Sequence, residues 1–130
     1  MIVLDASALV DLLLRRPAAR ETAAAIGTER TIHAPHLVDT EVLHVLRRWV
    51  TRDWLALPRA EIALRDLAEL RLMHHGHRPL RARVWALRER FGAYDATYVA
   101  LAEALDATLV TSDGRLARGA RGFVPVVHAS

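Results

Sequence analysis

The chain has 130 residues, of which 52% are hydrophobic, and this suits one folded domain over residues 1–130 and excludes a mostly disordered chain. Cysteine is absent, so disulfides, thiolate metal sites and cysteine nucleophiles are excluded. All 18 basic residues are arginines, the formal net charge is +3, and the lack of lysine excludes P-loop nucleotide chemistry, Schiff-base chemistry and phospho-receiver switching.

The chain opens with MIVLDAS, an apolar run that is far too short for a signal peptide, and no stretch approaches the length of a membrane span. We therefore expect a cytoplasmic protein that makes no contact with a membrane. The arginines suit phosphate contacts, because the planar guanidinium binds two oxygens at once. Biased genomic composition explains them equally well.

Short apolar strands alternate with helices along the first half of the chain. Pro17 suits the first turn of a helix, and Gly27 suits its end. We predict, in chain order, a strand at 2–4, a helix over about 8–14 capped by Ser7, a helix from 17 to near 27, a strand at 31–33 and a helix over about 36–50.

The second half continues this alternation. Pro58 marks the start of a helix, and Gly92 closes another. We predict a helix over 58–69, a strand at 71–74, a turn in the HHGHRP segment, a helix over 80–91, a helix over about 94–105, a strand at 108–111, a helical turn at 115–118 and a last strand near 123–127.

This alternation predicts an α/β protein, a three-layer α/β/α sandwich around a mostly parallel sheet of about five short strands. Ligands of such sheets bind beyond the carboxyl ends of the strands. Asp5 and Asp113 each follow a predicted strand, Asp95 lies where one helix begins at the same edge, and Glu41 lies about five residues, or roughly 7 Å, into another such helix. We therefore expect these four acids to converge.

Four converging carboxylates need a cation. Two like charges 4 Å apart repel by about 4 kcal/mol at an effective dielectric constant near 20. Oxygen ligands without cysteine favour Mg²⁺ or Mn²⁺ over zinc. The chemistry that follows is metal-assisted hydrolysis of a phosphodiester in RNA or DNA, with arginines at the rim holding the nucleic-acid backbone.

Each acid taken singly also has a structural interpretation. Asp5 is a possible helix cap, although Ser7 is already placed to serve, and Asp113 before Gly114 is an ordinary turn or cap residue. Asp95 in a first helical turn is favourable against the helix dipole. Glu41, beside a buried apolar stripe, has the weakest structural explanation.

Three segments together resemble the PIN-domain superfamily, and within it the VapC-type toxins of bacterial toxin–antitoxin pairs. The segments are MIVLDASALVDLLL, APHLVDTEVLHVLRR and YDATYVALAEAL with the following ATLVTSDGRLAR. The resemblance covers essentially the whole chain and implies that Asp5, Glu41, Asp95 and Asp113 are the catalytic and metal-binding acids. It also implies supporting roles for the hydroxyls of Thr111 and Ser7. A further acid of some members is not matched, because Gly114 and Arg115 stand there.

The resemblance implies an endoribonuclease that depends on Mg²⁺ or Mn²⁺, acts on tRNA or ribosomal RNA and is neutralised by a VapB-like antitoxin. It also implies a homodimer. A housekeeping RNA-processing nuclease of the same superfamily is the alternative, and a catalytically silent module that binds RNA or protein is a third.

Other side chains are given lesser roles. Arg115 and Arg118, close behind Asp113, are candidates for contact with the RNA backbone. The histidines of the HHGHRP segment are expected in a solvated loop, and His36 and His44 at a surface or interface. The tryptophans Trp49, Trp54 and Trp85 are expected in the core or at an interface rather than as platforms for base stacking.

Overall fold

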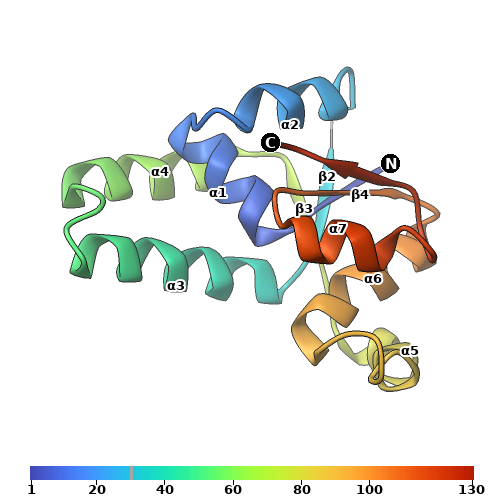
Figure 1. The fold of residues 1–130 in the computed structure, drawn as a ribbon. Helices are drawn as coiled ribbons and strands as arrows, with labels where there is room; N and C mark the ends of the chain where they lie inside the picture. Colours follow the sequence, from blue (N-terminus) through green and yellow to red (C-terminus); the bar gives the residue numbers. More distant parts are fainter. Residues whose placement is uncertain (30) are drawn as a thin grey trace.

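The computed structural model describes residues 1–29 and 31–130. Within these residues, five parallel strands form one sheet in the order β3-β2-β1-β4-β5 (Figure 1). The strands are β1 (Ile2–Leu4), β2 (Ile32–Pro35), β3 (Leu72–His75), β4 (Thr108–Thr111) and β5 (Val126–His128). The predicted α/β class with a central parallel sheet is confirmed.

The helices pack on both faces of this sheet. Parallel strands are joined by right-handed crossovers, so the connections from β1 to β2 and from β2 to β3 place their helices on one face, and the connection from β3 to β4 uses the other. The helices are α1 (Ala6–Leu14), α2 (Ala19–Ile26), α3 (Leu37–Thr51), α4 (Leu57–Glu69), η1 (Arg78–Leu80), α5 (Arg81–Ala86), α6 (Ala93–Leu105) and α7 (Gly114–Ala120). None of these described helices is long and apolar enough to cross a bilayer.

The direction of chain progression reverses between β1 and β4, which are neighbours in the sheet. Parallel pairing sets Leu4 opposite Val110, and the Asp5 amide donates to the Val110 carbonyl at 3.2 Å. The residues that follow the two strands therefore leave the sheet side by side. Such a reversal of strand order opens a crevice at the carboxyl edge, where ligands bind in parallel sheets.

Burial follows from the position of each strand. The central strand β1 is covered on both faces, and Val3 and Leu4 have no exposed surface. Helix α6 covers the sheet with a broad apolar face, in which Tyr98 is 2% exposed and Val99 fully buried. This packing sets where the first turn of α6 lies, at the carboxyl edge of the sheet.

The predictions for the end of α5 and for His75 were wrong. Helix α5 ends at Ala86 rather than near residue 91, because Phe91 turns away to pack edge-on against Phe123 at 5.6 Å between ring centroids. Strand β3 extends to His75, whose ring is held by His33 at 2.9 Å, so His75 is not in a solvated turn. Trp54 and Trp85 are 65% and 69% exposed, so neither lies in the core, and their place at an interface stays a prediction.

Candidate active site

Asp5 is buried where β1 ends, and its carboxylate is fully engaged. Its Oδ1 accepts from the Ala8 amide at 2.9 Å and from the Ser7 hydroxyl at 2.8 Å, and its Oδ2 accepts from the Thr111 hydroxyl at 2.6 Å. Asp5, and not Ser7, is therefore the N-cap of α1, which begins two residues earlier than predicted. Aspartate and serine are both common N-cap residues, so the residue at which β1 ends determines which of the two caps α1.

The two hydroxyls that contact Asp5 are themselves fixed by the backbone of the turn after β4. Ser7 Oγ accepts from the Ser112 amide at 3.0 Å, and Thr111 Oγ1 accepts from the Asp113 amide at 3.0 Å. Each hydroxyl donates its single proton to Asp5. The 3.2 Å between Ser7 Oγ and Thr111 Oγ1 is therefore a contact of two oxygens without a hydrogen bond. The network holds Asp5 in one orientation and ties β1 to β4.

Burial dominates the ionisation of Asp5. It raises the pKa of Asp5 from 3.8 to about 6, against the hydrogen bonds from Ala8, Thr111 and Ser7, which favour the charged form. The negative charge of Asp113 adds to the increase. Asp5 is thus a carboxylate at neutral pH whose hydrogen bonds offset only part of the cost of its burial.

Asp113 stands across from Asp5 at the end of β4 and begins α7. Its Oδ1 accepts from the amides of Arg115 and Leu116, at 2.9 and 3.2 Å, as an N-cap does. The ordinary capping role considered for Asp113 is therefore real. We call Asp5, Ser7, Thr111 and Asp113 the strand-end corner.

Glu41 approaches the same edge from α3. Tyr98 donates its hydroxyl to Glu41 Oε1 at 2.7 Å, across from α6. Burial raises the pKa of Glu41, the bond from Tyr98 opposes this, and the charge of Asp95 raises it further. Burial and the bond to Glu41 raise the pKa of Tyr98 well above its usual value, so Tyr98 stays a neutral donor.

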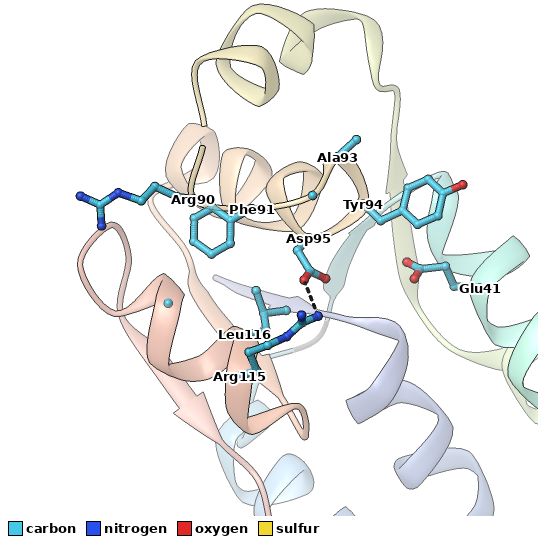
Figure 2. A pocket seen from close by; sticks show the side chains of 10 residues that line it. Glu41, Arg90, Phe91, Ala93, Tyr94, Asp95, Arg115 and Leu116 are labelled. Carbon is cyan, nitrogen blue, oxygen red and sulfur yellow. Dashed lines mark ion pairs between the residues drawn. The ribbon is translucent and has the colours of Figure 1, made fainter. Parts of the chain in front are cut away.

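Asp95 lies in the first turn of α6 and faces a cavity of about 650 Å³. Figure 2 shows Asp95 and Arg115 pointing toward one another across this cavity, with 3.8 Å between Asp95 Oδ2 and Arg115 Nη2. Burial raises the pKa of Asp95 and the charge of Asp113 raises it further, while Arg115 lowers it. We call Glu41, Asp95, Tyr98 and Arg115 the helix pocket.

Electrostatic coupling links all four acids in a series. Asp113 raises the pKa of both Asp5 and Asp95, and Asp95 raises that of Glu41. The structure therefore brings the four predicted acids to one edge of the sheet, at the crevice between β1 and β4. Arg115 is the cation closest to Asp95, and its side chain is 81% exposed.

The donor set fits a hard divalent ion, since it consists of carboxylate oxygens that repel one another. As placed among residues 1–29 and 31–130, however, no three aspartate, glutamate or histidine side chains are close enough to hold an ion between them. Asp5 and Asp113 already spend oxygens on internal hydrogen bonds. Binding an ion therefore requires the corner and the pocket to draw together.

Sequence reasoning missed some residues of the site. Tyr98 follows Asp95 by three positions, a helical spacing that sets both on one face, and this spacing was the available signal for its bond to Glu41. Arg90 and Phe91 line the cavity, although Arg90 extends away from the carboxylates in Figure 2. Arg118 is exposed on α7 and is not among the residues that line this cavity.

Comparisons with known proteins agree with this geometry. The sequence profile of the PIN domain matches residues 2–122. VapC ribonuclease Mb0985 from Mycobacterium bovis is 43% identical over 126 residues, which cover 97% of this chain and 96% of that protein.

Solved structures show the same fold. The crystal structure of PAE2754 from Pyrobaculum aerophilum superposes with a TM-score of 0.71 at 25% identity, covering 96% of this chain and 81% of the other. VapBC2 from Rickettsia felis, bound to a DNA fragment from their promoter, gives a TM-score of 0.72 at 18% identity and covers the whole of both chains.

Proposed function

This chain belongs to the PIN domain family, and from that premise we propose that it is a divalent-metal-dependent endoribonuclease, the toxin of a toxin–antitoxin pair. The observation that carries the proposal is the series of coupled acids, Asp5, Asp113, Asp95 and Glu41, at the crevice between β1 and β4. A module that only bound RNA would have no use for uncompensated negative charge beside a phosphate.

The four acids have separate tasks in this proposal. Asp5 contributes a desolvated charge in a fixed orientation, because Thr111 and Ser7 hold it. Asp95 and Asp113 are less buried acids that approach it from α6 and from the end of β4, and Glu41 is held by the hydroxyl of Tyr98. A bound Mg²⁺ or Mn²⁺ supplies an activated water and charge for the departing oxygen.

The substrate proposed is RNA, with tRNA and ribosomal RNA as the first classes to test. Hydrolysis adds water across one P–O bond, which leaves a phosphate monoester on one fragment and a hydroxyl on the other. Arg115 at the cavity rim is placed to contact the RNA backbone, and exposed Arg118 is a second candidate.

The partner proposed is a VapB-like antitoxin, supported by the relatives named VapC and by the fold shared with VapBC2. Such a protein would neutralise the nuclease, and the active species would be a homodimer. We propose that the nuclease acts in the cytoplasm, where tRNA and ribosomal RNA are found.

The test is cleavage of total cellular RNA by purified protein free of antitoxin, in Mg²⁺, in Mn²⁺ and in EDTA, beside the Asp95→Asn variant. Discrete fragments that require the metal and vanish in the variant are the expected result. Folded protein that binds RNA but cleaves it in no condition would replace the nuclease with a binding module.

A further inference from the structure

A second hollow, of about 330 Å³, lies next to the acidic cavity. The two share Phe91, Gly92 and Ala93 as a common wall. Gly92 and Ala93 are exposed, and a Cβ added at Gly92 would meet no atom within 4 Å. The wall is therefore low, and a chain molecule lying in the acidic cavity can continue across it into the second hollow.

Trp85 is the main feature of this hollow. Its side chain is 69% exposed, which is unusual for a residue that usually buries most of its large apolar surface. Arg88 places its guanidinium 4.7 Å from the centre of the indole ring and donates to the Trp85 carbonyl at 3.0 Å. The indole is thus supported on one face by a cation and open elsewhere.

The packing of α5 does not require Trp85. Leu80 and Leu87, at the two ends of the helix, are buried at 7% and 3% exposure. Arg83 binds Glu103 of α6 with two parallel hydrogen bonds of 2.8 and 2.9 Å. These contacts fix α5 against α6, so the indole is presented to the hollow from a firmly held helix.

Within the described part of the chain, the hollow is lined by positive charges alone, whereas the acidic cavity is lined by two acids, Glu41 and Asp95, and by two arginines, Arg90 and Arg115. Arg81 and Arg88 line it beside Trp85, and among the described residues that line it there is no aspartate or glutamate. Single-stranded nucleic acids are held by this combination, in which a base stacks on an aromatic ring and arginines contact the neighbouring phosphates. Val84 and Phe91 would also suit an apolar side chain, but the two arginines favour an occupant that carries phosphates.

We propose that the Trp85 hollow is a nucleobase subsite, which stacks a base of single-stranded RNA one or a few nucleotides from the phosphodiester held at the acids. The proposal rests on the proposed function, because it takes the acidic cavity as the place where RNA is cut. The volume lies at the lower end of small-ligand sites, roughly 300 to 1,000 Å³, as one planar base requires. Binding there would orient the strand across Gly92 and Ala93.

The chain offers a matched control. Trp54 is 65% exposed and also lies under a guanidinium, that of Arg52 at 5.0 Å, but it is in the α3–α4 connection and lines neither hollow. Trp54→Ala therefore removes an equally exposed indole with a similar cationic neighbour. It leaves the proposed subsite untouched.

The experiment measures the Kd of fluorescein-labelled U₁₂ and A₁₂ RNA, and of an abasic twelve-unit backbone, by fluorescence anisotropy in EDTA. Trp85→Ala should raise the Kd for the base-bearing probes about 5- to 100-fold and leave the abasic Kd unchanged. Trp85→Phe should keep most of the affinity, and Trp54→Ala should bind like the unaltered protein. Circular dichroism and thermal melts check that each variant is folded.

Several results would overturn the subsite. They are unchanged Kd values in Trp85→Ala, an equal loss for abasic and base-bearing probes, or no binding of RNA by the unaltered protein. Normal RNA binding by Trp85→Ala, with loss of binding to the proposed VapB-like antitoxin, would assign the hollow to a protein partner instead.

The same samples separate this proposal from the nuclease. RNA cleavage by the unaltered protein in Mg²⁺ or Mn²⁺ with no effect of Trp85→Ala on binding removes the subsite and keeps the nuclease. If the Kd for RNA depends on Trp85 but RNA is cleaved with neither metal, the subsite is kept and the nuclease is removed.

Discussion

The strand-end corner and the helix pocket hold acids in opposite ways. In the corner, Asp5 is 5% exposed and accepts three hydrogen bonds from within the protein. In the pocket, Asp95 keeps 31% of its side chain exposed and faces a cavity, with one arginine 3.8 Å away. Asp5 in the corner is therefore held in a fixed orientation by hydrogen bonds. Asp95 in the pocket keeps carboxylate oxygens that are available to bind a ligand.

In both regions, burial and neighbouring acids disfavour the charged form of the carboxylates. Burial raises the pKa of Asp5, Glu41 and Asp95 alike, and each is raised further by another acid of the site. A cation shared by the two regions would lower the repulsion between these acids. Four predictions separate the contributions of the corner and the pocket.

The largest expected effect is on cleavage, and it is common to both regions. Loss of residues that only support metal ligands costs about 10- to 100-fold in metal affinity or activity. Asp5→Asn and Asp95→Asn, which alter the acids themselves, should each lower RNA cleavage by well over 100-fold. A variant that is folded by circular dichroism and still cleaves at more than a tenth of the normal rate would remove its acid from the site.

The next effect separates the corner from the pocket through pH. The raised pKa of Asp5 means that the folded state holds its proton more tightly than the unfolded state, so this stability is present below pH 3.8 and is lost as pH rises through about 6. The shift corresponds to about 3 kcal/mol.

Asp5→Asn removes this dependence, so it should gain stability relative to the unaltered protein as pH rises from 4 to 7 without metal. Urea unfolding of both proteins across that range measures the difference. Taking the difference cancels His75, whose lowered pKa acts in the opposite direction because its protonation favours the unfolded state. A difference that does not vary with pH would contradict the burial of charge at Asp5.

Within the pocket, Tyr98→Phe removes the donor that orients Glu41 and leaves the ring in place. We expect Mn²⁺ affinity, measured by isothermal titration calorimetry, to fall about 10- to 100-fold. Tyr94→Phe, which removes an exposed hydroxyl from the same cavity, is the control for the loss of a hydroxyl at the cavity rim. Equal Mn²⁺ affinity in Tyr98→Phe and the unaltered protein would show that Glu41 needs no such support.

The smallest effect concerns Arg115, which stands near Asp95 where a metal would compete with it. Exposed ion pairs contribute less than about 1 kcal/mol, so Arg115→Gln should tighten Mn²⁺ binding by no more than about five-fold. Arg118→Gln, on the same helix and away from the cavity lining, should leave the affinity unchanged. Weaker Mn²⁺ binding in Arg115→Gln would mean that the arginine supports the site.

The sequence alone predicted β1 and β4 with the bounds that the structure has. Both are short apolar runs that end at polar residues. A central strand of a parallel sheet is buried on both faces, so its apolar pattern does not depend on the rest of the fold. The meeting of Asp5, Asp113, Asp95 and Glu41 followed from the same topology. Their catalytic and metal-binding roles remain predictions.

Other features depend on contacts that no local pattern contains. The helical pattern continues past Ala86, but the packing of Phe91 against Phe123 ends α5 early. Asp5 rather than Ser7 caps α1 because β1 ends at Leu4, which makes Asp5 the residue just before the helix. The exposure of Trp85 depends on how α5 docks on α6, which is set by Arg83 and Glu103.

The central claim is that corner and pocket hold one divalent ion together, and titration of metal-free protein with Mn²⁺ by calorimetry at neutral pH tests it most directly. The proteins to compare are the unaltered chain, Asp5→Asn, Asp113→Asn, Asp95→Asn and Glu41→Gln, with Glu61→Gln on the exposed side of α4 as control. We predict saturable binding that each of the four site variants weakens by more than ten-fold and that the control preserves. A shared site would be contradicted if the unaltered protein bound no Mn²⁺. It would also be contradicted if Mn²⁺ binding survived the loss of the corner acids or of the pocket acids.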